Sequence, residues 1–207
     1  MSIIEAENLK KQFGKKVLFE DLSFQIKAGE MVAVTGKSGC GKTTLLNILG
    51  LIEPFDSGKV RIVGRPAPRP NSRAAQKMIR NELSYLFQNF ALIDTETVEA
   101  NLMLAASGTD RKKEIQNALR AVGLEHTRLQ KVFELSGGEQ QRIAIARTML
   151  KRGKIVLADE PTGSLDPKNR DHVLKLLHDL CREGKTVLII THDPVVAKRC
   201  DRILPLA

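Results

Sequence analysis

Aromatic residues are scarce in this chain. Its 207 residues include no tryptophan and a single tyrosine, and aromatics make up 4% of the sequence. Because proteins that bind single-stranded nucleic acid stack bases on rows of aromatic side chains, we do not expect a surface of that kind. The formal net charge of +9 nevertheless suits an acidic partner, whether a nucleotide, a nucleic acid or an anionic membrane surface.

Cysteines and long apolar runs are also few. Cys40, Cys181 and Cys200 show neither CxxC pairing nor histidine-rich spacing, which speaks against a disulfide framework and a zinc site. The run Leu45–Ile52 is among the longest apolar stretches. It is far shorter than the roughly 18 to 20 residues of a membrane helix. Because the N-terminus also lacks the basic-then-apolar order of a signal peptide, we expect a cytosolic protein.

The chain alternates apolar runs with helical patterns. "MVAVT" (31–35), "IVLA" (155–158) and "VLII" (187–190) are almost wholly apolar, as interior strands of a parallel sheet are. This alternation predicts an α/β fold with helices on the faces of a mostly parallel sheet. We interpret residues 1–207 as one domain, with a helical insertion from about Asn89 to Arg152.

The remaining elements are predicted from shorter patterns. Further β-like runs lie at residues 2–9, 22–26, 56–64, 83–88 and 201–206. Helices are expected at residues 44–52, 96–106, 110–124, 137–153 and 167–184. The segment 65–73 contains three prolines and is interpreted as an irregular surface connection.

A phosphate-binding loop follows the strand 31–35. Residues 36–43 fit the pattern G-x-x-x-x-G-K-[ST] between an apolar strand and a helix, which is the context that this motif requires. Its glycines let the loop curl so that backbone amides face a β-phosphate. Lys42 would bring positive charge to the β- and γ-phosphates, and the Thr43 hydroxyl can ligate Mg²⁺. The candidate ATP-binding residues are Gly36, Lys37, Ser38, Gly39, Cys40, Gly41, Lys42, Thr43 and Thr44, with the Cys40 sulfur incidental.

Polar residues end three of the apolar strands. "IVLADE" places Asp159 and Glu160 after one strand, where Asp159 would hold Mg²⁺ and Glu160 would polarise the attacking water. Gln88 ends "LSYLFQ", and His192 follows "TVLIIT". Since ligands of doubly wound sheets bind at the carboxyl ends of strands, we expect these residues to converge on the γ-phosphate. Taken alone, a histidine such as His192 is more often structural than catalytic, and it is the convergence with the other residues that favours a catalytic role.

A second anion site is indicated about a hundred residues after the first. "LSGGEQQ" (135–141) has a serine and two glycines directly before a helical pattern, so its amides and the positive end of the helix dipole can hold an anion.

Together these motifs resemble the nucleotide-binding subunit of ABC transporters, in order and over practically the whole chain. "GKSGCGKT" matches Walker A, Gln88 the Q-loop, "LSGGEQ" the signature, "IVLADE" Walker B, Ser164–Asp166 the D-loop and His192 the switch histidine. The resemblance implies a P-loop NTPase (RecA-like) core, an N-terminal antiparallel β subdomain and an inserted helical subdomain that carries the signature. Phe13 occupies the adenine-stacking position, although it could also be a core residue.

The resemblance also implies an ATP hydrolase that works in pairs. Two chains would stack head to tail as a homodimer, with each ATP and Mg²⁺ between one P-loop and the other chain's signature. The metal ligands would be Thr43, Gln88 and Asp159, and the catalytic residues Glu160, His192 and Gln88. The partner-chain ATP contacts would be Ser136, Gly137, Gly138, Glu139 and Asp166.

A membrane permease is the implied partner, docked around Gln88 to Leu104, with the ATPase peripheral on the inner face of the membrane. "LFQNFALIDTETVEANL" and "ADEPTGSLD" resemble the branch that serves lipoprotein release and macrolide, peptide and bacteriocin export. Ser164, where that branch usually has Asn, is a departure. The lack of a C-terminal regulatory domain also favours an exporter.

Three alternatives remain at this stage. A soluble ABC ATPase acting on nucleic acid or ribosomes would suit the basic charge, but no coiled coil, zinc module or second ATPase unit is present, and direct nucleic-acid binding is not expected. An ABC importer ATPase would share every motif. A small-molecule kinase would leave "LSGGEQQ" without a purpose.

Overall fold

Two sheets form the frame of the molecule in the computed structural model, which describes residues 1–163 and 165–206. Within these residues, four antiparallel strands in the order β2-β1-β4-β5 make one sheet, and five parallel strands in the order β6-β7-β8-β3-β9 make the other. The antiparallel strands are β1 (Ser2–Phe13), β2 (Lys16–Lys27), β4 (Ser57–Ile62) and β5 (Arg65–Pro66). The parallel strands are β3 (Met31–Thr35), β6 (Leu83–Leu86), β7 (Ile155–Asp159), β8 (Thr186–Ile190) and β9 (Arg202–Pro205).

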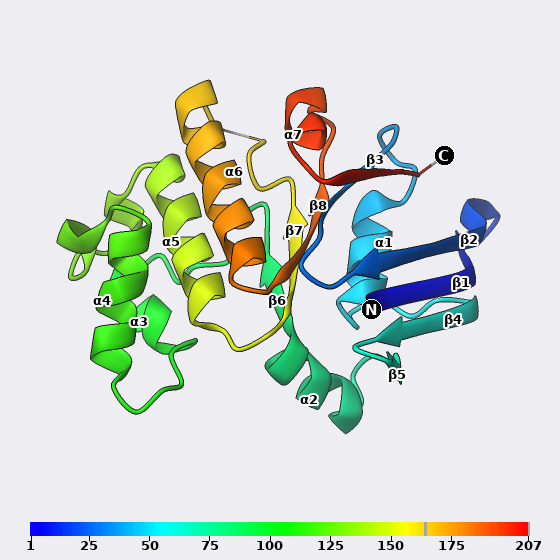
Figure 1. The fold of residues 1–207 in the computed structure, drawn as a ribbon, viewed down its shortest axis with the longest axis horizontal. Coiled ribbons are helices and arrows are strands. Elements are labelled where there is room, and N and C mark those ends of the chain that lie inside the picture. The colour runs from blue at the N-terminus through cyan, green and yellow to red at the C-terminus, as the bar shows by residue number, and fades with distance from the viewer. Residues whose placement is uncertain (164, 207) are drawn as a thin grey trace.

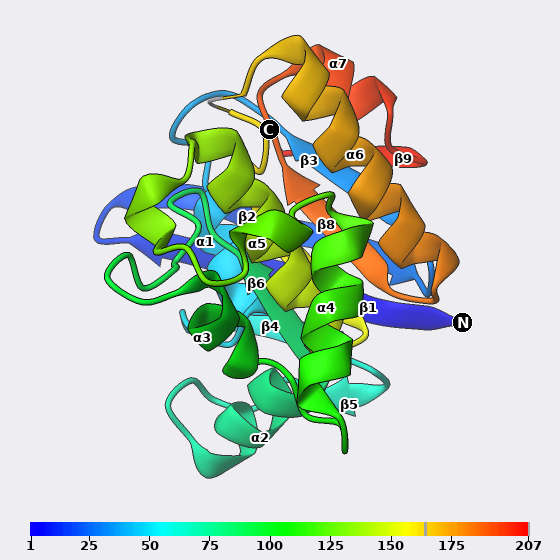
Figure 2. The ribbon, with the colours of Figure 1, turned by 90° about the vertical axis from the view of Figure 1, so that its left-hand side faces the viewer.

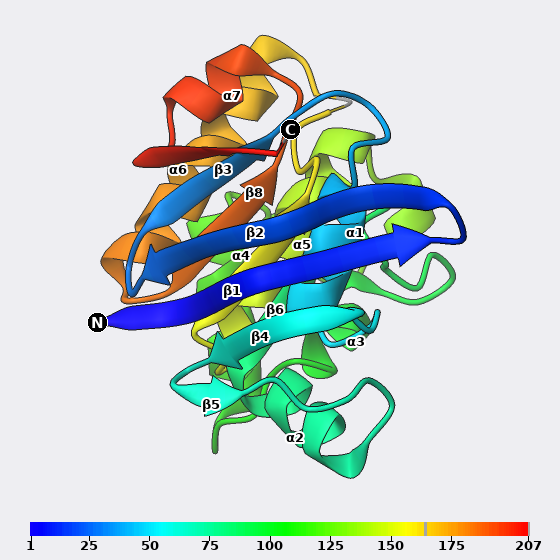
Figure 3. The ribbon, with the colours of Figure 1, turned by 90° about the vertical axis from the view of Figure 1, so that its right-hand side faces the viewer.

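Helices cover both faces of the parallel sheet. Helix α1 (Lys42–Leu49) contacts β7 and β8 on the side of the antiparallel sheet, whereas α5 (Gly137–Leu150) contacts β6 and α6 (Pro167–Arg182) contacts β8 (Figure 1). Figure 3 shows the long strands β1 and β2 of the antiparallel sheet lying in front of α1 and the parallel strands. The other helices are α2 (Arg73–Glu82), α3 (Val98–Met103), α4 (Arg111–Ala121) and α7 (Pro194–Lys198), with 3₁₀ turns at Glu125–Thr127 and Val132–Glu134.

Strand β7 shows how the sheet divides the core. Successive strand residues point to opposite faces. Ile155 and Leu157 therefore pack in the core shared with α1 and the antiparallel sheet, while Val156 and Ala158 pack in the core shared with α3 to α6. All four are fully buried, which explains why the run has no polar alternation.

The helices α3, α4 and α5 gather at one side of the parallel sheet, away from the antiparallel strands (Figures 1 and 2). Helix α5 packs against α3, α4, α6 and β6, so it belongs to the helical cluster and to the central core at once. Ile143, Ala144, Ile145 and Ala146 are all fully buried, because neighbours surround this part of the helix. The boundaries of the helical insertion, about 89 to 152, stay a prediction.

The predicted fold class is confirmed, but several elements were placed wrongly. Strands β1 and β2 are each longer than expected, and the predicted helix 96–106 shortens to α3. Helices α2 and α7 were missed. Helix α2 is capped by Ser72, whose hydroxyl accepts from the amide of Ala75 at 3.1 Å, but most of its residues are polar or charged and only Ala75 and Met78 are buried. None of the helices in the two described ranges is both long enough and apolar enough to cross a membrane.

Candidate ATP-binding and hydrolysis site

The loop from Gly36 to Gly41 connects β3 to the first turn of α1, and its glycines are structurally required. Gly39 and Gly41 have positive φ angles of 77° and 101°, which residues with a side chain rarely adopt. A Cβ at Gly36 would lie 2.4 Å from the carbonyl oxygen of Leu206. The loop can therefore wrap tightly, with its amides at the positive end of α1.

Lys42 lies across this loop. Its Nζ donates to the carbonyl oxygens of Gly36 and Lys37, both at 2.9 Å. The two contacts hold the ammonium group beside the loop amides, where it can offset the charge of a bound phosphate. Cys40 packs instead against the apolar core, in keeping with an incidental sulfur.

Asp159 and Glu160 leave the end of β7 in different environments. Burial raises the pKa of Asp159, and the adjacent charge of Glu160 raises it further. A hydrogen bond with Thr43 and the charge of Lys42 lower it. Asp159 is thus a half-buried carboxyl group beside the P-loop, and a cation there would stabilise its ionised form.

The backbone of Glu160 is strained. Its φ angle is +45°, a left-handed conformation that is uncommon for a residue with a side chain. The amide of Glu160 donates to the carbonyl oxygen of Ile190 at 3.1 Å, which fixes the turn against the neighbouring strand β8. The conformation holds the carboxyl group at the junction of β7 and β8.

His192 orients one oxygen of Glu160. Oε1 accepts from the His192 amide at 3.1 Å and lies 2.7 Å from the ring Nδ1. The hydrogen bond to Glu160 is the main cause that raises the pKa of His192. Oε2 of Glu160 is buried, and no described protein group hydrogen-bonds to it. One carboxylate oxygen is therefore held by His192, and the other is buried without a described protein partner.

An open cleft of about 410 Å³ brings these groups together. It lies at the carboxyl ends of the parallel strands and is lined by Phe13, Lys16, Leu18, Ser38, Gly39, Gly41, Lys42, Thr43, Thr44, Gln88, Asp159, Glu160 and Ile190. His192 joins this set through Glu160 rather than as a wall of the cleft. Gly36, Lys37 and Cys40 belong to the loop but do not line the cleft.

Phe13 and Lys16 form the side of the cleft that comes from the antiparallel sheet. Phe13 is 51% exposed, so the alternative that it is a core residue is wrong. The ammonium of Lys11 lies 4.5 Å from the centre of its ring. Lys16 was missed in the sequence because it lies outside the loop motif, and only the β1–β2 turn brings it near Gly39.

The signature segment starts helix α5 with a capping box. Ser136 is the N-cap, and its amide and hydroxyl both donate to Oε2 of Glu139, at 2.9 and 2.6 Å. These hydrogen bonds lower the pKa of Glu139. Gly137 meets no neighbouring atom at its Cβ position, which leaves the helix start open on that side. None of Ser136, Gly137, Gly138 and Glu139 lines the cleft.

Asp166 caps helix α6 beside the signature. Its Oδ1 accepts from the amides of Lys168 and Asn169, at 3.0 and 3.1 Å. The side chain of Asn169 bonds to Asp166 and also accepts from Arg142 of α5 at 2.8 Å. Asn169 and Arg142, which tie the two segments together, were missed because neither belongs to a recognised motif. Ser164, the first residue of the predicted D-loop, lies outside the described residues.

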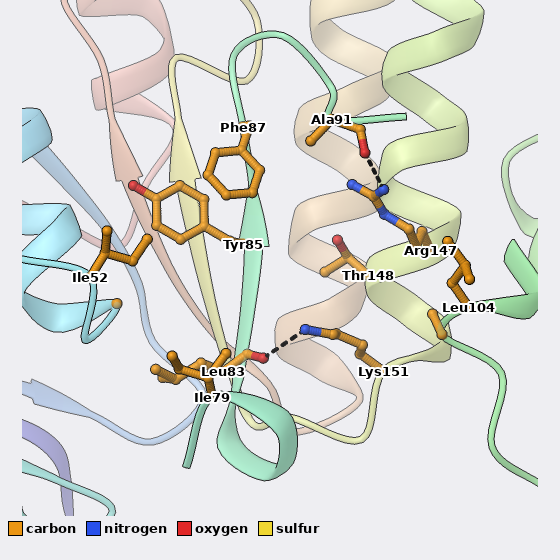
Figure 4. A pocket seen from close by; sticks show the side chains of 12 residues that line it. Ile52, Ile79, Leu83, Tyr85, Phe87, Ala91, Leu104, Arg147, Thr148 and Lys151 are labelled. Carbon is orange, nitrogen blue, oxygen red and sulfur yellow. Dashed lines mark hydrogen bonds between the residues drawn. The ribbon is translucent and has the colours of Figure 1, made fainter. Parts of the chain in front are cut away.

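A separate groove of about 340 Å³ lies between the sheet and the helical cluster (Figure 4). Its lining combines apolar and aromatic residues with two cations: Gly50, Ile52, Ile79, Leu83, Tyr85, Phe87, Ala91, Leu104, Ala105, Arg147, Thr148 and Lys151. Tyr85 and Phe87 stack with their ring centres 4.1 Å apart. Leu104, at the rim, is 71% exposed.

Comparisons with known proteins show which family this chain resembles in sequence. Residues 19–163 match the family model described as ABC transporter. The chain is 39% identical over 194 residues to the macrolide export ATP-binding/permease protein MacB of Shigella flexneri, covering 91% of this chain and 30% of that protein. It is 35% identical over 215 residues to MacB of Neisseria meningitidis, covering 100% of this chain and 33% of that protein. The chain thus spans about a third of the length of these relatives.

Solved structures match over nearly the whole chain. The dimeric ATP-binding cassette MJ0796 in a post-hydrolysis state with ADP and Pi is 34% identical, with a TM-score of 0.87, covering 98% of this chain and 94% of that one. CbiO1 of Clostridium perfringens, part of the ABC transporter complex cbiONQ, is 28% identical, with a TM-score of 0.89, covering 99% and 84%. The chain therefore belongs to the ABC transporter family, as an ATP-binding cassette that hydrolyses ATP.

Proposed function

We propose that two copies of this chain bind ATP between them and drive a separate membrane permease that exports a peptide, bacteriocin, lipoprotein or drug. The observation that carries the proposal is the separation of the two anion sites within one chain. The cleft is lined by the P-loop and the ends of the strands, whereas the open start of helix α5 lies outside it. A second copy would place the start of its own helix α5 against the open side of this cleft.

The homodimer gives the signature a purpose. In a head-to-tail pair, Ser136 and the amides of Gly137 and Gly138 would meet the γ-phosphate held by the partner's Lys42. Asp166 and Glu139 would lie at the same interface. The dimeric cassette structures of MJ0796 support this arrangement, because they share the fold over 98% of this chain.

The donor set fits Mg²⁺. The Thr43 hydroxyl, the Gln88 amide oxygen and the Asp159 carboxylate are hard oxygen donors, and all three residues line one cleft. Asp159 has a pKa raised by burial and by Glu160, so a divalent cation beside it would relieve an unfavourable charge. When bound with ATP, the ion would neutralise charge on the β- and γ-phosphates.

Glu160 would polarise the attacking water with its unpaired oxygen, since Oε1 is held by His192. His192 would hold this carboxylate in the correct orientation. Loss of the γ-phosphate removes the group that bridges both chains, so hydrolysis would let the pair separate. The two chains would thereby alternate between a closed dimer with ATP and an open state after hydrolysis.

The groove between the parallel sheet and the helical cluster is the proposed permease site. It includes Ala91 and Leu104 from the predicted docking segment and Phe87 directly before it, and its apolar lining suits a short helix of a membrane protein. The MacB relatives are named as ATP-binding/permease proteins, which supports a permease partner and export. The ATPase would then lie in the cytoplasm, peripheral on the inner face of the membrane. The comparisons add nothing in favour of the nucleic-acid, ribosome or importer alternatives.

The test is capture of the permease from detergent-solubilised membranes by the tagged chain. Leu104→Glu would place a charge at the groove rim and should abolish capture of the membrane protein. Leu129→Glu is the matched control, because Leu129 is 72% exposed and lies outside the groove. Equal capture by both variants would contradict docking at this groove. A captured permease with few spans and a large extracytoplasmic domain supports export, whereas one paired with a solute-binding protein would contradict it.

A further inference from the structure

The turn that follows β6 separates the groove from the ATP cleft. Phe87 and Ala91 line the groove, whereas Gln88, between them in sequence, lines the cleft. The conformation of this turn therefore affects the position of Gln88.

The turn is strained at two consecutive residues. Phe90 and Ala91 have φ angles of +64° and +48°, in the left-handed region that side-chain-bearing residues rarely adopt. Locally it is held by the amide of Phe90, which donates to the Phe87 carbonyl at 3.0 Å, and by the amide of Ala91, which donates to the Asn89 carbonyl at 2.7 Å. A pair of left-handed residues persists only where surrounding contacts impose it.

Arg147 of helix α5 provides such contacts. One guanidinium nitrogen donates to the carbonyl oxygen of Ala91, as Figure 4 shows, and the other donates to that of Phe90 at 2.8 Å. The two bonds grip successive peptide units in the geometry for which a planar guanidinium is suited. Asn101 holds the later part of the loop, since its side chain bonds to both the amide and the carbonyl of Ile93.

Arg147 is a cation in a partly buried position, which is unfavourable unless its hydrogen bonds to the turn compensate for the burial. Burial lowers its pKa, and no carboxylate within the described residues forms an ion pair with it. Among the described residues, the hydrogen-bond acceptors of its guanidinium are these two carbonyls, and Lys151, directly after α5, is a like charge that lines the same groove.

We propose that Arg147 is a positioning residue for Gln88. Its two hydrogen bonds hold the strained turn at Phe90 and Ala91 and thereby fix the backbone segment that carries Gln88. The inference rests on the proposed function, which places Gln88 at the nucleotide. Lysine would not replace arginine fully, because an ammonium group cannot grip two successive carbonyls with a planar fork.

The grip itself is tested by amide hydrogen exchange on the purified chain. Arg147→Ala should speed exchange in residues 88–93 by roughly tenfold or more, while the core strands stay protected. Arg152→Ala is the control, because Arg152 follows the same helix and donates only to the Ser107 carbonyl, at 3.3 Å. Unchanged exchange of residues 88–93 in Arg147→Ala would overturn the proposal. If this variant does not fold, Arg147→Lys should show the same local effect at smaller size.

The route through Gln88 is tested by a double-mutant cycle on ATP hydrolysis. Arg147→Ala should lower kcat by roughly 10- to 100-fold with little change in KM. In a Gln88→Ala background it should have almost no further effect, because the residue that it positions is gone. If the two substitutions lowered kcat independently, so that their fold-reductions multiplied in the double variant, positioning through Gln88 would be overturned. An unaltered hydrolysis rate in Gln88→Ala alone would instead overturn the role of Gln88 in the proposed function. The hydrogen-exchange experiment would still test whether Arg147 holds the turn.

Discussion

Glu160 and His192 meet through a single carboxylate oxygen. Oε1 of Glu160 accepts from the backbone amide of His192 and lies 2.7 Å from its ring Nδ1. The contact exists because β7 and β8 are neighbours and each residue follows the end of its strand. It leaves Oε2 buried and without a described protein partner, and this is the oxygen that we propose polarises the attacking water.

Replacing Glu160 with Gln should separate binding from hydrolysis. We expect ATP binding to persist and the hydrolysis rate to fall by roughly 10²- to 10⁴-fold, since an amide cannot accept the proton of the attacking water. The bridging γ-phosphate would then stay in place, so the variant should elute as a dimer in gel filtration with Mg²⁺ and ATP. Elution only as a monomer would count heavily against the ATP sandwich.

Ser136→Arg should abolish turnover but leave ATP binding to the isolated monomer almost unchanged. The reason is that Ser136 lies outside its own chain's cleft, while a bulky cation at the start of α5 would block the partner chain. Binding of a fluorescent ATP analogue at low protein concentration provides the measurement. A large loss of monomer affinity would mean that the signature serves its own chain.

Lys42→Ala should weaken ATP binding by roughly 10- to 100-fold, because a charge-assisted contact to phosphate is lost. Titration calorimetry with ATP measures this effect. Lys59→Ala is a matched control, since this exposed lysine of β4 does not line the cleft. Equal affinities of the wild-type chain and Lys42→Ala would remove the lysine from the phosphate site.

The titration of His192 should report its contact with Glu160. The carboxylate raises the pKa of His192 above the ordinary value of 6.5. The ion pair therefore stabilises the fold at pH values below 6.5 and is lost as pH rises through the higher folded-state pKa. An NMR titration of the imidazole should show a pKa that falls toward 6.5 in Glu160→Gln. A pKa that does not change in this variant would contradict the interaction.

Local chemistry by itself determined much of this protein. The glycines of the P-loop, the capping box of Ser136 and Glu139 and the apolar runs of β3, β7 and β8 depend on neighbouring residues, so their patterns are readable along the chain. The order of the motifs was sufficient to indicate the family. Helix α2 escaped notice because most of its residues are polar or charged, although its few apolar residues recur at helical spacing.

Only the tertiary structure decided how distant residues meet. The sheet order β6-β7-β8-β3 brings Gln88, Asp159 and His192 to one edge, and the length of β1 and β2 carries Phe13 out of the core to the cleft. The grip of Arg147 on Phe90 and Ala91 joins residues 56 and 57 positions apart. Such contacts depend on how helices and strands pack against one another, and the spacing of residues along the chain does not predict that packing.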